Sequence, residues 1–184
     1  EIGYPYILFS DNANDNKPQV YKDKGHEIYA SNLCTEIMLP SNEDWSFVCC
    51  LSSINVVHYD KWKDTDAVET LAYFLDAVME EFINKLEVYR DSSERDDQLT
   101  FTFMRKAYKF AKENRALGLG ALGWHSLLQS KMLPFDSEGA DSLNNEIFKL
   151  IEEKSYKASE EMAMIYGEPK VLKGYGRRNT TLNA

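Results

Sequence analysis

Hydrophobic residues recur every three or four positions along three stretches of the chain, and each stretch predicts an amphipathic helix. The clearest helix is expected over residues 66–88, with Asp66 at the capping position and Glu69 three residues later. Two further helices are expected over 99–114 and 141–166. The residues expected to face the core are Val68, Leu71, Leu75, Val78, Met79, Phe82 and Leu86, then Phe103, Ala107, Phe110 and Ala111, then Leu143, Ile147, Leu150, Ile151, Ala158, Met162 and Ile165.

Shorter apolar runs, rich in aromatic and β-branched residues, predict strands between these helices. The expected strands are 4–9, 47–57 and 117–122, the expected loops are 11–15 and 90–98, and a short helix is expected at 124–131. Gly167, with Pro169 just beyond it, predicts the end of the last helix. Because strands alternate with helices, the sequence predicts an α/β fold with parallel strand pairing.

Composition narrows the class of protein. The 184 residues suit one domain, and 43% hydrophobic residues are enough for a packed core. The formal net charge of −9 disfavours nonspecific binding to nucleic acid or to an anionic membrane. No apolar run approaches the roughly 20 residues that span a bilayer, and no signal peptide is recognisable. Three cysteines do not suit a disulfide scaffold, which favours a reducing compartment and a cytoplasmic location.

The richest chemistry lies in the run Ser31-Asn32-Leu33-Cys34-Thr35-Glu36-Ile37. In an extended segment, side chains at alternate positions point to the same face. Asn32, Cys34 and Glu36 would then converge on one substrate. An amide, a sulfur capable of redox or radical chemistry and a base are the parts of a reaction centre.

This run resembles the active-site finger loop of the catalytic (large) subunit of class I ribonucleotide reductase, whose pattern is Asn-x-Cys-x-Glu. Three more segments resemble that family in the same order, and together they cover nearly the whole chain: Cys49–Asn55, Arg115–His125 and Arg178–Leu182. The resemblance implies that residues 1–184 are an internal piece of that subunit, incomplete at both ends, with the finger loop at 28–39. The implied fold is part of a ten-stranded α/β barrel with long helices packed outside.

The resemblance also implies residue roles. Cys34 would become a thiyl radical that removes the 3′ hydrogen of the ribose, inside a barrel that shields the radical. Glu36 would be the general base for the 3′ hydroxyl. Asn32 would orient the ribose hydroxyls, with Ser31 beside it in the substrate site. Cys49 would be one of two cysteines that reduce the substrate.

The family further implies partners that this chain does not supply. No cofactor or metal is expected here, because the metal centre and the radical belong to a smaller partner subunit. The expected partners are a ribonucleotide, most simply a diphosphate, the remaining large-subunit segments, the radical-generating small subunit, and thioredoxin or glutaredoxin as reductant. Arg177 and Arg178 are the best local candidates for holding phosphate. Since the first reducing cysteine, the phosphate loop and the tyrosine relay are missing, the isolated chain is expected to be inactive.

Other interpretations of single residues stay open. Cys34 alone is more typical of a small buried hydrophobe, Glu36 of a solvated glutamate and Asn32 of a turn or cap. Cys50 points away from Cys49 on a strand and is expected to be structural.

Three alternative functions also stay open. Gly118, Gly120 and Gly123 form a Gly-x-Gly-x-x-Gly, with Glu138 at a plausible distance, so a dinucleotide-dependent oxidoreductase is one. A non-catalytic remnant or interaction module is another. The third is a zinc site, whose ligands would be Cys34, Cys49, Cys50 and His58, without the usual Cys-x-x-Cys spacing.

Overall fold

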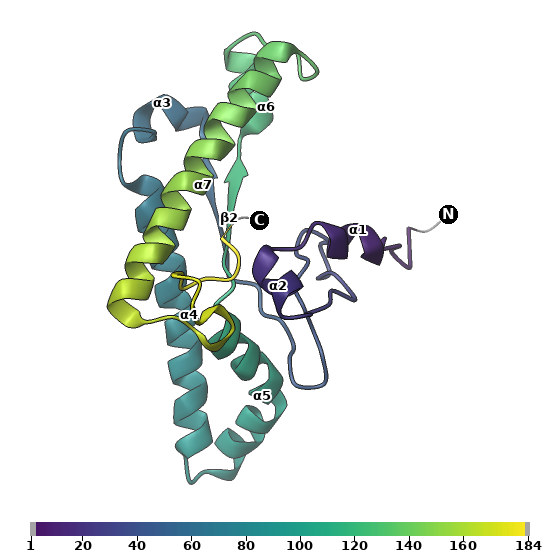
Figure 1. The fold of residues 1–184 in the computed structure, drawn as a ribbon, viewed down its shortest axis with the longest axis vertical. Helices are drawn as coiled ribbons and strands as arrows, with labels where there is room; N and C mark the ends of the chain where they lie inside the picture. Colours follow the sequence, from purple (N-terminus) through teal and green to yellow (C-terminus); the bar gives the residue numbers. More distant parts are fainter. Residues whose placement is uncertain (1–2, 183–184) are drawn as a thin grey trace.

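The structure is a computed structural model that describes residues 3–182. Long helices pack around a small parallel sheet, and a less regular N-terminal region lies to one side (Figure 1). The strands are β1 (Leu51–Asn55) and β2 (Gly118–Leu122). The helices are α1 (Ser10–Asp15), α2 (Gln19–Asp23), α3 (Tyr59–Trp62), α4 (Ala67–Asp91), α5 (Arg95–Asn114), α6 (Trp124–Ser130) and α7 (Glu138–Tyr166), with short 3-10 turns η1 (Val56–His58) and η2 (Lys170–Leu172).

The two strands pair in parallel, with Leu51 opposite Gly118 at the start of the ladder. The chain after α7 returns to the other edge of β2. There the Leu117 amide donates to the Thr181 carbonyl at 3.0 Å, and the Leu119 amide donates to the Leu182 carbonyl at 2.7 Å. Residues 180–182 therefore run beside β2 in the same direction and extend the sheet. The predicted α/β class and parallel pairing are confirmed.

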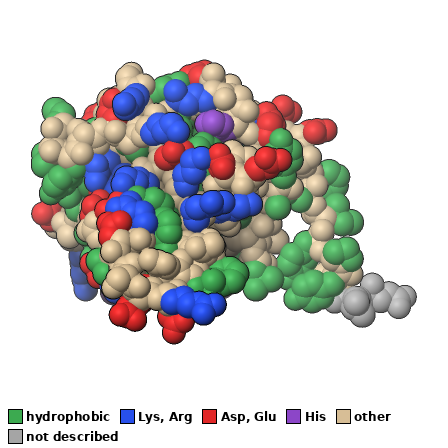
Figure 2. All heavy atoms as spheres, turned by 90° about the horizontal axis from the view of Figure 1, so that it is seen from below, with side chains coloured by type: hydrophobic (Ala, Val, Ile, Leu, Met, Phe, Trp, Pro, Cys, Tyr) green, Lys and Arg blue, Asp and Glu red, His purple; other side chains and the backbone are tan. Residues whose placement is uncertain are grey.

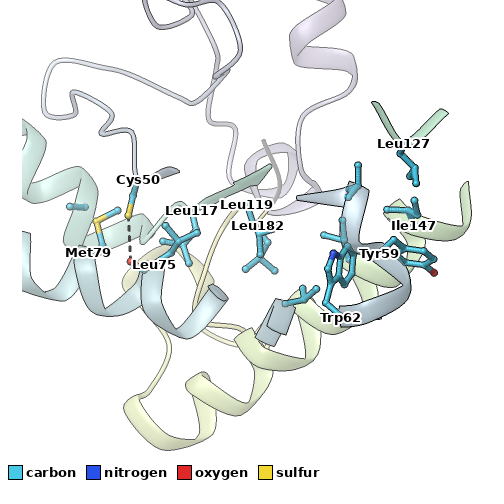
Figure 3. Packing of buried hydrophobic residues seen from close by; sticks show 14 of the residues in the cluster. Cys50, Tyr59, Trp62, Leu75, Met79, Leu117, Leu119, Leu127, Ile147 and Leu182 are labelled. Atoms are coloured by element: carbon cyan, nitrogen blue, oxygen red, sulfur yellow. Dashed lines mark hydrogen bonds between the residues drawn. The ribbon is translucent and has the colours of Figure 1, made fainter. Parts of the chain in front are cut away.

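The long helices form the outer layer. α4 and α5 make an antiparallel hairpin, and α7 packs against α4 (Figure 1). The main hydrophobic core lies between these helices and the sheet, where Leu75 and Met79 of α4 approach Leu117 and Leu119 of the β2 segment (Figure 3). Cys50 belongs to this core, and its thiol donates to the Leu75 carbonyl at 3.4 Å. This contact fixes the start of β1 against α4.

A second core attaches the N-terminal region to α5 and η2. Its buried members are Val20, Tyr21, Ile37, Leu39, Trp45, Phe110, Ala116, Val171 and Leu172. The Tyr21 hydroxyl also donates to Thr180 Oγ1 at 2.7 Å. The segment that carries the finger loop thus packs against residues far away in the sequence, in α5 and η2.

A buried ionic network ties α4, α7 and the last strand-like segment together. Asp76 of α4 is 5% exposed. Its Oδ1 accepts from Arg115 Nε and Asn179 Nδ2, both at 2.9 Å, and its Oδ2 accepts from Arg115 Nη2 at 2.9 Å and Arg178 Nε at 2.8 Å. Ser159 of α7 donates to Asn179 Oδ1 at 2.8 Å. One carboxylate therefore receives four hydrogen bonds from three residues, which lie in two separate parts of the chain.

The helix predictions are confirmed, with some ends displaced. α4 runs to Asp91 and α5 begins at Arg95, so the loop expected over 90–98 shrinks to three residues. Asp96 and Asp97 lie in the first turn of α5, where acidic side chains stabilise a helix. α7 begins at Glu138, because Ser137 caps it by accepting from the Ala140 amide at 3.2 Å.

Other local predictions are wrong. Residues 4–9 form no strand, and residues 11–15 lie in α1 instead of a loop. The expected strand 47–57 is limited to β1 and continues as η1. A strand needs a neighbour to pair with, which a local pattern does not reveal. Three residues expected in the core are exposed: Val78 (43%), Phe103 (78%) and Ile165 (63%).

Candidate active site

The finger loop is a tight turn and not an extended strand. The Asn32 amide donates to the Ile37 carbonyl at 3.2 Å, and the Thr35 amide donates to the Asn32 carbonyl at 3.1 Å. Thr35 has a φ of 65°, in the left-handed region that such a turn requires. The expectation that Asn32, Cys34 and Glu36 alternate along a straight strand is therefore wrong.

Asn32 closes this turn with its side chain as well. Its Oδ1 accepts from the Ile37 amide at 3.0 Å. Ser31 Oγ donates to the Asn32 carbonyl at 3.1 Å. Ile37 itself is buried in the second core and anchors the stem of the loop. Asn32 is thus a turn asparagine as far as its side-chain oxygen, Oδ1, is concerned. Its side-chain nitrogen, Nδ2, takes no part in closing the turn.

The turn nevertheless brings the predicted groups to Cys49. A cavity of about 60 Å³ is lined by Glu36 and Cys49 together with residues of both strands. The other lining residues are ones that the sequence analysis did not assign to the substrate site: Ile37, Met38, Leu39, Val48, Cys50, Leu51, Ala116, Leu117, Gly118 and Thr181. Thr181 lies more than a hundred positions beyond Cys49, and the sequence motifs that contain them do not reveal that the two line one cavity.

The pKa of the Cys49 thiol also reflects the closeness of the finger-loop side chains. Partial burial and the nearby Glu36 carboxylate raise the pKa of the Cys49 thiol, and Cys34 adds to this effect. A hydrogen bond from the Asn32 side chain acts in the opposite direction and lowers the pKa. The four groups therefore share one small region at the start of β1.

The site is open in this chain. Cys34, Glu36 and Cys49 are all exposed, and Leu33 at the tip of the turn is 80% exposed. The expected shielding of a radical inside a barrel is not provided by residues 3–182 alone. Cys50 is buried in the core, as expected of a structural cysteine.

Replacing Glu36 should make Cys49 more reactive. Because the carboxylate helps to raise the Cys49 pKa, Glu36→Gln should increase the thiolate fraction and speed alkylation of Cys49 by iodoacetamide roughly two- to threefold at mildly alkaline pH. Peptide mass spectrometry of the labelled chain gives the rate. Glu43→Gln, in an exposed glutamate of the same segment, is the matched control. An equal acceleration in both variants would contradict the proximity of Glu36 to Cys49.

The predicted phosphate ligands have other partners. Arg178 is buried and donates to Asp76 and to the carbonyls of Tyr166 and Gly167, at 3.1 and 3.0 Å. Arg177 lies over the ring of Tyr156, 4.9 Å from its centre. The prediction of Arg178 as a phosphate ligand is wrong, because its Nε donates to a carboxylate 102 residues away and its Nη1 donates to two backbone carbonyls.

The glycine motif is explained by packing. Gly118 and Gly120 lie inside β2, whereas a dinucleotide motif begins after its strand. Gly123 has a φ of 85°, and a Cβ there would lie 2.8 Å from both Asn55 Oδ1 and Val57 Cγ2. Gly123 therefore lets the turn after β2 approach Asn55 and Val57 closely.

The zinc hypothesis receives no support from the structure. Within residues 3–182, no group of three or more His, Cys, Asp or Glu side chains is placed to hold a metal ion.

In the same range of residues, no helix is long and apolar enough to cross a membrane. Lys and Arg side chains are interspersed with Asp and Glu on the face seen in Figure 2.

Comparisons with known proteins identify the domain. The family model described as ribonucleotide reductase, barrel domain, matches residues 1–181. A solved structure, the alpha subunit of class Id ribonucleotide reductase from Actinobacillus ureae, has a TM-score of 0.88 and 55% sequence identity, and the match covers 99% of this chain and 33% of that one. These matches define the class as an α/β barrel domain.

Curated relatives agree with this assignment. A protein of Frog virus 3 (isolate Goorha), named as a ribonucleoside-diphosphate reductase large subunit, is 40% identical over 182 residues, covering 99% of this chain and 30% of its own length. The large subunit of Invertebrate iridescent virus 3 is 36% identical over 185 residues, with 100% and 27% coverage. The chain belongs to the ribonucleotide reductase family and forms part of its barrel domain. It spans less than a third of the length of these curated relatives.

Proposed function

We propose that this chain supplies the thiyl-radical centre of a ribonucleoside-diphosphate reductase large subunit. The observation that carries the proposal is the convergence of Glu36 and Cys49 on one cavity, with Asn32 and Cys34 acting on the same Cys49 thiol. A base, an amide and two thiols within one small region suit reduction of a ribose. Membership of the family supports the same reaction.

The proposed chemistry assigns one step to each group. The Cys34 sulfur radical takes the 3′ hydrogen of the ribose, and Glu36 accepts the proton of the 3′ hydroxyl, so that the 2′ hydroxyl leaves as water. Cys49 and a second cysteine give two electrons and two protons and become a disulfide. Cys34 then returns its hydrogen atom to the 3′ carbon. The sum is a ribonucleotide and two thiols giving a deoxyribonucleotide, a disulfide and water.

The partners follow from this chemistry. The second cysteine and the cover of the exposed site would come from the remaining large-subunit segments. A smaller metal-bearing subunit would supply the oxidising equivalent that generates the radical. Thioredoxin or glutaredoxin would reduce the disulfide, and a ribonucleoside diphosphate would be the substrate, with Ser31 near its ribose. Because the three cysteines are free, we place the protein in the reducing cytoplasm.

Reconstitution tests the proposal. A mixture of the remaining large-subunit segments and the small subunit should form deoxyribonucleoside diphosphate only when this chain is added. The chain alone should give no product, because its site is open to water and lacks a second reducing cysteine. Chromatography of labelled nucleotides measures the product. Full activity without this chain would reject the proposed function.

A further inference from the structure

The Asn14 side chain holds the backbone where it enters the finger loop. Its Nδ2 donates to the carbonyl of Ile28 at 2.9 Å, and its Oδ1 accepts from the amide of the same residue at 3.0 Å. Both backbone groups of Ile28 are therefore bonded to a single side-chain amide. A residue paired across two antiparallel strands exchanges the same two bonds. Asn14 thus takes the place of a neighbouring strand at Ile28.

The amide of Asn14 is itself fixed by two further contacts. Its Nδ2 also donates to the Ser10 carbonyl of α1 at 2.9 Å, and its Oδ1 accepts from Lys17 Nζ at 3.2 Å. A side-chain amide has two N–H donors and two lone pairs on its oxygen, so all four are used here. Lys17 is 9% exposed and pairs with Glu27, the residue before Ile28, at 2.8 Å. The orientation of Asn14 is therefore set from the α1 side.

The two ends of the finger loop are anchored differently. The exit from the loop, at Ile37 and Leu39, is buried in the second core. At the entry, residues 27–31 belong to no helix or strand. Among the residues that the structure describes, only Asn14 hydrogen-bonds to the backbone of residues 27–31. The position of the entry thus depends on one side chain far more than the position of the exit does.

The entry of the loop matters because the loop carries the groups that act on Cys49. Asn32, which hydrogen-bonds to the Cys49 thiol, lies four residues beyond Ile28, and Glu36 lines the cavity beside that thiol. We propose that Asn14 is a positioning residue, which fixes Ile28 and thereby keeps the finger-loop groups at Cys49. The effect of Asn14 on turnover rests on the function proposed above, whereas its effect on the position of the loop does not.

A double-mutant comparison on this chain tests the position of the loop. Glu36→Gln should speed alkylation of Cys49 by iodoacetamide roughly two- to threefold in the natural chain. In the Asn14→Ala background the same change should speed it less than about 1.5-fold, because a displaced loop no longer holds the carboxylate beside the thiol. If Asn14 only stabilised the fold, Asn14→Ala would lower the Tm and leave the effect of Glu36→Gln unchanged. An unchanged effect, or no effect of Glu36→Gln in either background, would overturn the proposal.

Asn16→Ala is the matched control for Asn14→Ala. Asn16 also donates from its side chain to a carbonyl of α1, that of Asn12 at 2.8 Å, and among the described residues no hydrogen bond joins its side chain to the finger loop. The effect of Glu36→Gln should therefore be the same in this background as in the natural chain.

A second variant covers the case in which Asn14→Ala does not fold. Asn14→Asp keeps an acceptor for the Ile28 amide and loses the donor to the Ile28 carbonyl. The acceleration by Glu36→Gln should then fall between the values for the natural chain and for a displaced loop. An acceleration as large as in the natural chain would overturn the proposal.

Turnover in the assembled reductase tests the consequence for the reaction. Asn14→Ala should lower kcat about tenfold or more and change KM less than about threefold, because a misplaced reacting group slows chemistry more than it weakens binding. Asn16→Ala should turn over normally. A normal kcat for Asn14→Ala in an active assembly would overturn the positioning role. If assemblies that contain the natural chain form no deoxyribonucleotide, the proposed reductase function fails, and the alkylation comparison still decides whether Asn14 positions the loop.

Discussion

Cys34→Ser should abolish nucleotide reduction in the assembled reductase, with a loss on the order of a thousandfold or more. A serine hydroxyl is nearly the same size as a thiol, but its O–H bond is too strong to give up a hydrogen atom in this exchange. Since Cys34 is exposed and belongs to no core cluster, the fold should be unaffected. Product formation and thermal unfolding, measured on the same preparation, separate the two effects.

The two other cysteines provide the comparison. Cys49→Ser should still permit radical formation at Cys34 but stop normal turnover, since the disulfide cannot form. Cys50→Ser places the same change in the core, where the hydroxyl can donate to the Leu75 carbonyl, and turnover should persist. Equal and mild losses for Cys34→Ser and Cys49→Ser would reject the assigned roles.

Asp76→Asn should lower the free energy of unfolding by about 3–5 kcal/mol, because it removes the buried carboxylate of Arg115 and Arg178 and leaves them only the partly exposed Glu80 as an acidic partner. Asp91→Asn is the control. Asp91 pairs with its neighbour Arg90 at the surface, and such exposed pairs contribute about 0–1 kcal/mol. Urea unfolding monitored by tryptophan fluorescence measures both variants. Equal losses would show that the buried network does not hold the fold.

The Asp76 carboxylate should also make the free energy of unfolding depend on pH in the acidic range. Burial raises the pKa of Asp76, but Arg115 and Arg178 outweigh it and hold the pKa below its usual range. The stabilisation is therefore complete above the unfolded-state pKa of about 3.9 and is lost as pH falls toward the lower folded-state pKa. Between these values the unfolded chain binds more protons, so stability rises with pH. Urea titrations at several acidic pH values should show this slope in the natural chain and a shallower one in Asp76→Asn.

The long helices were predictable because their signal is local. The spacing of Leu75, Met79 and Leu86 defines the buried side of α4 without knowledge of its neighbours. Gly167 marks the end of α7 for a similar reason, since its φ of 83° is one that glycine adopts readily. The errors at Phe103 and Ile165 arose because an apolar stripe does not reveal how far the neighbouring element extends.

The site was predictable in its members but not in its geometry. Cys34, Glu36 and Cys49 were identified by their motifs, but the turn at Thr35 depends on bonds between Asn32 and Ile37 that the pattern does not contain. Arg178 was misassigned because its partner Asp76 lies in a distant helix. Contacts across the sequence decided each of these points.

The second hydrophobic core has a consequence for protein engineering. The finger loop rests on Ile37 and Leu39, which pack beside Val171 and Leu172 at the far end of the chain. If residues 28–39 alone were exchanged between two reductases, the donor loop would pack against η2 residues of the recipient, to which its own side chains are not matched. The loop and the η2 segment beneath it have to be transplanted as one unit, since the support is as much a part of the loop's shape as its own sequence.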